Sequence, residues 1–258
     1  AIEGGNKITT DTVFNLPTTI YARWEDAGTI VTNQDELVAA IGSAKPVITI
    51  ANDFNLTSKL TINAPVKING GDYTVTCTGQ SGEYFVFGGD ATYEFNGGTF
   101  TTTGGDPIYA NSNFTGTIKL TNGAKFICNA PINFSSSAAG TFILDGGIVE
   151  ASKNAIKNQG STTIQLLSGT VSTTSPNNAV ITTTGGTKGT LTVGKPDGTG
   201  PTITRTNPDS TGELIYLNAG VENLTHNFYG GNIINPGSGA AIYMGISSVI
   251  NIDAGTFV

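Results

Sequence analysis

The sequence is short of charge and of the rarer side chains. Only 12% of its 258 residues are charged, and it has one histidine, one tryptophan, one methionine and two cysteines. The 12 basic residues are outnumbered by 19 acidic ones, which gives a formal net charge of −7. No basic stripe is present that could release counterions from a nucleic acid, so we expect no nucleic-acid partner.

Long hydrophobic runs are missing as well. No apolar stretch in the sequence approaches the roughly 20 residues that cross a bilayer, so no transmembrane segment is expected. No signal peptide is visible either, which is typical of a mature or trimmed chain whose leader has been removed.

A repeat of strands and glycine turns fills most of the chain. The 35 glycines, together with many threonines, asparagines and serines, favour turns and strands over helices. In each copy an alternating strand is followed by a glycine-centred turn and an apolar residue. The copies read VKINGGDYTV (66–75), YEFNGGTF (93–100), IKLTNGAKF (118–126), FILDGGIV (142–149), IQLLSGTV (164–171), HNFYGGNI (226–233) and INIDAGTF (250–257).

A second motif, a short apolar pair, falls between these copies. It recurs three times in steps of 24 residues and then in steps of 35 and 27, at Ile108, Ile132, Ile156, Val180, Ile215 and Ile242. A unit this short cannot bury its own apolar face, so the coils must stack on one another. The two motifs predict an all-β fold, a right-handed single-stranded parallel β-helix of about 24 residues per coil. Turn glycines are predicted at positions 71, 98, 123, 147, 169, 231 and 255.

The two cysteines take equivalent positions in this repeat. Cys77 and Cys128 should lie two coils apart, about 9–10 Å by the strand spacing. A disulfide needs Cα atoms within about 7 Å, and the spacing fits no metal motif. We therefore predict two free, buried thiols.

A capping helix and one long domain complete the predicted organisation. Residues 33–42 form a predicted amphipathic helix, with Asn33 as N-cap, Glu36 in a capping box and an apolar stripe of Leu37, Val38, Ala40 and Ile41. Residues 1–32 are expected to be an extension along the cap or a strand of the first coil. The domain then covers 33–258, with an irregular insertion near 185–212 and an uncapped end inside a repeat, as in a fragment or a chain with a further domain.

This order of elements resembles a known family. A short helix, a strand, the step DFNLTSKLTI and the step APVKINGG are similar to the N-terminal capping region of the pectin-lyase-like right-handed β-helix superfamily. With the repeats, the resemblance covers residues 33–258, and the low charge looks most like adhesin-like bacterial cell-surface members. It implies a secreted or cell-surface location. The superfamily also includes polysaccharide lyases and hydrolases, but fold alone does not assign function.

The motifs that carry catalysis in those enzymes are not found. Arg205 is the only arginine inside the array, and the paired-Asp, Gly-His-Gly and Arg-x-Lys motifs of related galacturonases are missing. His226 is interpreted as a surface or strand-end histidine. An enzyme would need acids converging with Arg205, Lys195 or His226 on one face. A structure with no cleft holding two carboxylates within about 10 Å would rule out the usual glycosidase arrangement.

The best acidic candidates fall at repeated turn positions. Asp145 and Asp253 stand two residues before a turn glycine, where Asn96 also stands. We interpret them as side chains that support the turn by Asx-type hydrogen bonds, and Asp90 and Asp106, beside glycine-rich turns, in the same way. No catalytic residue, metal ligand or cofactor site is predicted.

Three tyrosines are the candidate ligand-binding residues. Tyr109, Tyr216 and Tyr243 each follow the inward residue of the second motif, so alternation points their rings outward. Such rings can stack on a sugar or a protein partner, or on one another to stabilise the solenoid face. The sequence therefore predicts a non-catalytic, monomeric adhesion, glycan-binding or stalk domain. A glycan or a host or extracellular-matrix protein would be its partner, and a polysaccharide lyase or glycoside hydrolase is the alternative.

Overall fold

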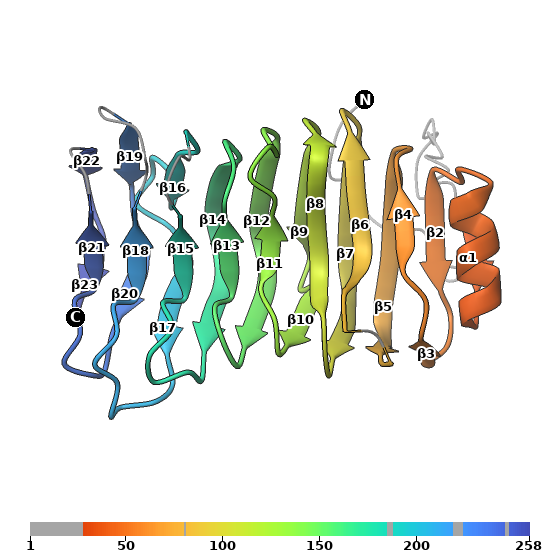
Figure 1. The fold of residues 1–258 in the computed structure, drawn as a ribbon, viewed down its shortest axis with the longest axis horizontal. Coiled ribbons are helices and arrows are strands. Elements are labelled where there is room, and N and C mark those ends of the chain that lie inside the picture. The colour runs from red at the N-terminus through yellow and green to blue at the C-terminus, as the bar shows by residue number, and fades with distance from the viewer. Residues whose placement is uncertain (1–27, 80, 185–187, 219–223, 246–247) are drawn as a thin grey trace, which may run out of the picture.

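The protein is an all-β parallel β-solenoid of about eight turns, with about 24 residues per turn. The computed structural model describes residues 28–258 except 80, 185–187, 219–223 and 246–247. Coils stack side by side along the long axis, and a helix lies over one end (Figure 1). The fold predicted from the two motifs is confirmed.

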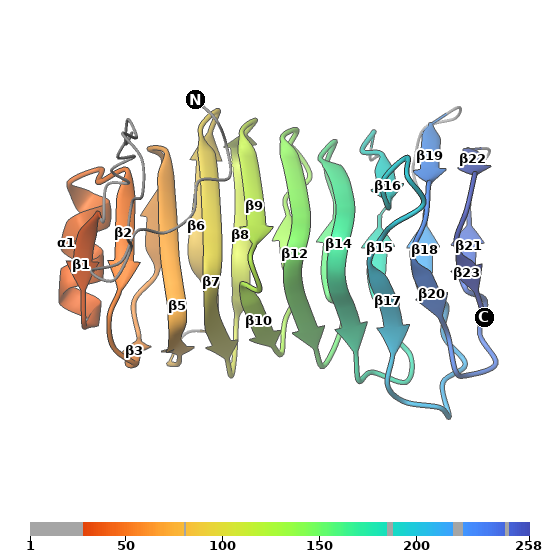
Figure 2. The same ribbon diagram turned by 180° about the vertical axis from the view of Figure 1, so that it is seen from behind.

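Two parallel sheets run the length of the solenoid (Figures 1 and 2). The longer one has 15 strands, and several coils cross it in two pieces on either side of the glycine turn. These strands are β1 (Thr29–Val31), β2 (Val47–Ile50), β3 (Phe54–Leu56), β5 (Val66–Cys77), β7 (Thr92–Thr102), β9 (Thr117–Thr121), β10 (Lys125–Cys128), β12 (Thr141–Ala151), β14 (Thr163–Thr173), β16 (Leu191–Val193), β17 (Thr202–Arg205), β19 (Thr225–Phe228), β20 (Asn232–Ile234), β22 (Val249–Ile252) and β23 (Thr256–Phe257).

The shorter sheet has eight strands and carries the second sequence motif. It consists of β4 (Leu60–Ile62), β6 (Glu83–Gly89), β8 (Asp106–Phe114), β11 (Ile132–Phe134), β13 (Ile156–Asn158), β15 (Ile181–Thr183), β18 (Ile215–Leu217) and β21 (Ile242–Met244). The register departs from the predicted spacing at one step, because Ile156 pairs with Ile181 and not with Val180. The carbonyl of Val180 accepts two backbone N–H groups, from Ala155 and Ile156, which shifts the pairing by one residue.

The core is a stack of inward side chains, one layer per coil. In β7 the alternation turns Tyr93, Phe95 and Phe100 inward, and each is at most 1% exposed. The ring of Phe95 lies 5.1 Å from those of Phe100 and Phe126, and the latter two are stacked at 4.9 Å. Since each buried ring contributes about 1.5–3 kcal/mol, coil-to-coil aromatic contact is a main source of stability.

The turn glycines adopt the left-handed backbone at six of the seven predicted positions, with one correction. In β12 the positive φ of 85° belongs to Gly146 and not to the predicted Gly147. Gly147 is needed for a different reason, because a Cβ there would lie 2.7 Å from the Cβ of Leu120 on the previous coil. The confirmed positions are Gly71, Gly98, Gly123, Gly169, Gly231 and Gly255.

Helix α1 (Gln34–Gly42) caps the solenoid as predicted. The Asn33 side chain accepts from the Glu36 N–H at 3.0 Å, and the Glu36 carboxylate reaches back to the N–H of Thr32 at 2.6 Å. Leu37 and Ala40 are buried, but Val38 is 41% exposed, so the predicted apolar stripe was one residue too wide. Val38 lies on the face of the helix that points away from the strands.

The predicted extension and insertion are also refined. Residues 29–31 form β1, which pairs with β2, and residues 1–27 lie outside the described part of the chain. The stretch near 185–212 is not one loop, because it contains β16 and β17, which continue the longer sheet. In the segments TLTV and TITR every second side chain is buried, so both strands add residues to the core. The residues before and after β17 form loops outside this alternation.

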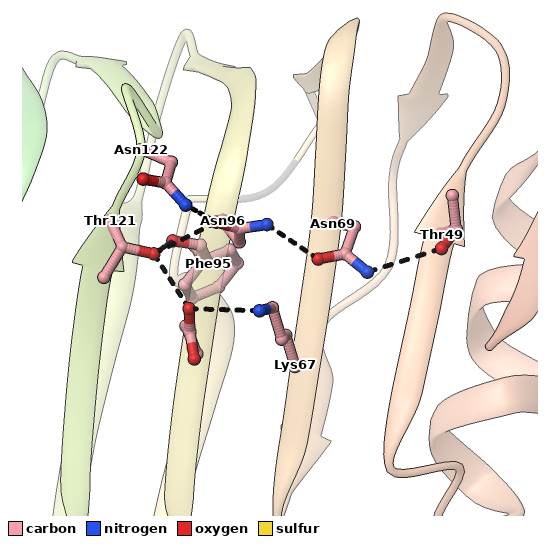
Figure 3. Close-up of polar contacts among 8 residues, drawn as sticks. Thr49, Lys67, Asn69, Phe95, Asn96, Thr121 and Asn122 are labelled. Carbon is pink, nitrogen blue, oxygen red and sulfur yellow. Dashed lines mark hydrogen bonds and ion pairs between the residues drawn. The ribbon is translucent and has the colours of Figure 1, made fainter. Parts of the chain in front are cut away.

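A ladder of side-chain amides joins neighbouring coils beside the glycine turn (Figure 3). Asn96 donates to Asn69 at 2.9 Å and accepts from Asn122, and Asn69 donates to Thr49 at 3.5 Å. Asp145 occupies the equivalent position on the next coil, and Ser168 on the coil after that donates to its carboxylate at 2.7 Å. The repeated turn position therefore binds coil to coil, in addition to any local role in the turn.

Among the described residues, no helix is long and apolar enough to cross a membrane.

Candidate functional site

The main cleft lies along one edge of the solenoid, where the longer sheet turns into the shorter one. Its volume is about 620 Å³, and four successive turns line it. No large apolar or aromatic side chain is among its lining residues. These are Ser81, Gly82, Glu83, Thr103, Gly104, Gly105, Asp106, Asn129, Ala130, Ser152 and Lys153.

The floor of the cleft is backbone because glycines stack there. A Cβ at Gly105 would lie 1.3 Å from the carbonyl oxygen of Gly82 on the preceding coil. Only glycine permits this approach. The two turns can therefore lie close enough to bring the first residues of β6 and β8 side by side.

Those two residues are carboxylates. Glu83 begins β6, Asp106 begins β8, and the two are register partners. Strands in a sheet lie about 4.8 Å apart, so the cleft holds two carboxylates on adjacent strands. The criterion stated from the sequence was that the usual glycosidase arrangement is excluded if no cleft holds two neighbouring carboxylates. This cleft holds two, so the arrangement is not excluded.

The two acids have different neighbours. Burial is the main factor that raises the pKa of Asp106, and the charge of Glu83 adds to it. A hydrogen bond of 2.7 Å from the Asn133 amide and the charge of Lys157 act in the opposite direction. Glu83 is paired with Lys59, whose ammonium lies 3.6 Å from its carboxylate. Burial therefore favours the protonated form of Asp106.

Polar side chains continue the cleft beyond the acids. Asn129 donates to the carbonyl of Thr103 at 3.0 Å, and Ser152 donates to the Asn129 side chain at 2.8 Å. Lys153 lines the far end of the cleft. The cleft thus offers acceptors at one end and an ammonium at the other, with amide and hydroxyl groups between them.

The predicted tyrosines do not form one cluster. Tyr216 and Tyr243 are register partners, and their rings are stacked at 4.9 Å with an interplanar angle of 3°. Tyr109 belongs to the same outward column, but Asn133, Lys157 and Thr182 separate it from Tyr216. Four strand spacings place it about 19 Å away. Tyr109 is three residues beyond Asp106 on β8 and is not among the residues that line the cleft.

Two of the three basic candidates of the enzyme alternative, Arg205 and His226, lie inside the solenoid. Arg205 is 1% exposed, and its guanidinium donates to the carbonyls of Pro176, Asn178 and Glu213. His226 is fully buried, because alternation in β19 turns it inward; of the two predicted positions, surface or strand end, the surface position is wrong. Neither lines the cleft.

The remaining acids and thiols have structural positions. Asp145 accepts from Ser168 and lies 3.0 Å from the ammonium of Lys195, and these contacts lower its pKa. Cys77 and Cys128 are free and buried, as predicted, and burial raises the pKa of each thiol to about 12. Within the described residues, no group of three or more His, Cys, Asp or Glu side chains could hold a metal ion.

Sequence reasoning missed the cleft because one copy of the second motif was not recognised. Glu83 stands two residues before Phe85, and Asp106 stands two residues before Ile108. Phe85 and Ile108 are register partners, so aligning them would have paired the two acids. Glu83, Asn129 and Lys153 were not predicted, and Asp106 was assigned to its local turn.

Comparison with protein-family models, with curated proteins and with solved structures gave no match. The assignment of the chain to the parallel β-solenoids therefore rests on its own register and coil geometry.

Proposed function

We propose that this chain is a non-catalytic glycan-binding domain of a secreted or surface-attached bacterial protein, built on a solenoid of the pectin-lyase-like type. The sequence resemblance suggests the superfamily, the location and the adhesin-like role. The polar cleft is the observation that carries the binding proposal. A monomer is expected, since each coil is completed by its own chain.

The chemistry of the cleft fits a hydroxyl-rich ligand. Sugar hydroxyls both donate and accept, and the carboxylates of Glu83 and Asp106 can accept from them while the Lys153 ammonium donates. Hydrogen bonds to charged groups contribute about 1.5–3 kcal/mol each, so a few of them can support weak binding without an apolar pocket. Tyr109 follows Asp106 by three residues, about 10 Å along β8, so its ring is available only to a ligand that extends beyond the cleft.

Calorimetric titration with soluble oligosaccharides chosen from a glycan array tests this proposal. Asp106→Asn and Glu83→Gln should each weaken binding about tenfold or more, which corresponds to roughly 1.4 kcal/mol or more. Asp145→Asn removes a carboxylate outside the cleft and should leave the affinity unchanged. No binding to any glycan, or equal losses in Asp106→Asn and Asp145→Asn, would refute the proposal.

The same titration tests the predicted tyrosines. A ligand that follows the outward column of the shorter sheet should bind more weakly to Tyr109→Ala and also to Tyr216→Ala or Tyr243→Ala. A ligand that extends from the cleft only as far as Tyr109 should respond to Tyr109→Ala alone. In that case the Tyr216–Tyr243 pair serves the stability of the solenoid face.

A hydrolase is the second candidate, and one observation favours it. Glycosidases use two carboxyl groups, one of them an acid of raised pKa; Asp106 has a raised pKa and is the register partner of a second carboxyl group, Glu83. Release of new reducing ends from a polysaccharide, lost in Asp106→Asn and Glu83→Gln, would replace the binding proposal with hydrolysis. Unchanged polymer length in the presence of measurable binding would exclude it.

A further inference from the structure

His226 is the single histidine of the chain, and it lies between the last two complete coils. It belongs to β19, which pairs with β16 on the preceding coil and with β22 on the following one (Figures 1 and 2). Its side chain is fully buried in a column of apolar residues. A buried imidazole has no role in the proposed glycan cleft, which is lined by residues 81–153.

The imidazole replaces part of the sheet ladder at this point. The backbone N–H of Leu191 at the start of β16 donates to Nδ1 of His226 at 3.1 Å. Backbone register between β16 and β19 covers only the next two pairs, Thr192 with Asn227 and Val193 with Phe228. The His226 ring therefore adds a hydrogen bond between β16 and β19, which the backbone alone joins over only two residue pairs.

This hydrogen bond requires a neutral ring. Nδ1 can accept only when it carries no proton, which places the proton on Nε2. Nε2 is buried and has no hydrogen-bond partner among the described residues. Protonation would remove the acceptor and leave a charge with no partner in an apolar interior, which is strongly unfavourable.

No charged group in the described structure offsets that charge. The strands packed against His226 from both sides, β16 and β22, contain no titratable residue, and neither does the rest of β19. The nearest charged residues along these elements, Lys188 and Asp253, are exposed, and Glu222 lies outside the described residues. Burial alone lowers the pKa of His226.

We propose that His226 is an acid-sensitive latch, whose protonation releases β19 from β16 and opens the coils that follow. Above a pH of about 6.5, the ordinary pKa of histidine, the latch contributes its full stability. As the pH falls below that value, the opened form takes up a proton more readily than the closed form. The ratio of open to closed coils then rises by up to about tenfold per pH unit until the lower pKa of the closed form is reached.

Hydrogen exchange followed by mass spectrometry tests the latch on the full chain. After correction for intrinsic exchange, peptides from β19 to β23 should lose protection on the order of tenfold between pH 7 and pH 5.5. Peptides from β5 and β7 should not change. Return to pH 7 should restore protection.

His226→Asn is the matched control, because its Oδ1 can accept from Leu191 but cannot titrate in this range. Its protection should be independent of pH even if its baseline is lower. The single imidazole also gives an unambiguous NMR titration, which covers the case of a poorly folded variant. Loss of protection equal in both proteins, no loss in the wild type, or an imidazole titrating near 6.5 with the coils closed would overturn the proposal.

Discussion

Arg205 offers the sharpest test of how the irregular coil is held. Replacing it with methionine keeps a long side chain but removes the guanidinium. That group joins the turn containing Pro176 and Asn178 to the turn that ends at Glu213, with donor–acceptor distances of 2.6, 2.8 and 2.8 Å. It also donates to the hydroxyl of Ser210.

The expected cost follows from the acceptors that lose their partner. An unsatisfied buried acceptor costs about 1–3 kcal/mol, and the carbonyls of Asn178 and Glu213 lose their donor, whereas that of Pro176 still accepts from the Ser210 hydroxyl. The lower end applies, because Thr206, Pro208 and Asp209 of the adjoining loop are exposed and admit water. Removing a buried charge also removes its desolvation penalty. We expect Arg205→Met to destabilise β17 and β18 by about 2 kcal/mol, taken as the sum of two such losses of about 1 kcal/mol.

Hydrogen exchange of peptides from β17 and β18, with urea unfolding of the whole chain, measures this effect. Lys195→Met is the control, since it also removes a cation from the same region. Its ion pair with Asp145 is exposed, and such pairs contribute about 0–1 kcal/mol. If Arg205→Met changes protection no more than Lys195→Met does, the assigned role of Arg205 is wrong.

Three further predictions concern the rest of the solenoid. Phe95→Ala should lower the free energy of unfolding by about 3–5 kcal/mol, measured in urea, and a loss below that of Phe95→Leu would contradict the aromatic core. Asn96→Ala removes bonds to both neighbouring rungs and should cost about 1–2 kcal/mol in the same assay, whereas no loss would show the ladder to be passive. Cys77 and Cys128, with a pKa of about 12 each, should resist iodoacetamide at pH 8 in the native state and react once urea unfolds the chain, because the thiolate is the nucleophile.

The fold could be predicted because its determinants are local and repeated. Alternation set the inward residues, glycines marked the turns, and the helix carried its capping signals at Asn33 and Glu36. Errors arose where one coil depends on another. Gly147 was predicted as the turn glycine of its coil, but the positive φ belongs to Gly146, and the need for glycine at 147 comes from Leu120 on the preceding coil.

The candidate site was harder to predict for the same reason. Asp106 lies beside a glycine-rich turn, but its contacts are with Glu83 on the coil before and Asn133 on the coil after. Arg205 was predicted to lie on the insertion and His226 at the surface or at a strand end, yet each side chain points into an inward column and hydrogen-bonds backbone groups of another coil. A one-dimensional pattern does not contain these contacts until the register is known.

The register itself is the central claim, and engineered disulfides test it directly. Ile143 and Gln165 are outward register partners on adjacent coils, and Gln165 pairs in turn with Thr192. Adjacent strands lie about 4.8 Å apart, within the Cα range of a disulfide, whereas two coils span about 9.6 Å and exceed it. Under mild oxidation, Ile143→Cys with Gln165→Cys should cross-link, and Ile143→Cys with Thr192→Cys should not. A cross-link in the second pair, or none in the first, would contradict the solenoid described here.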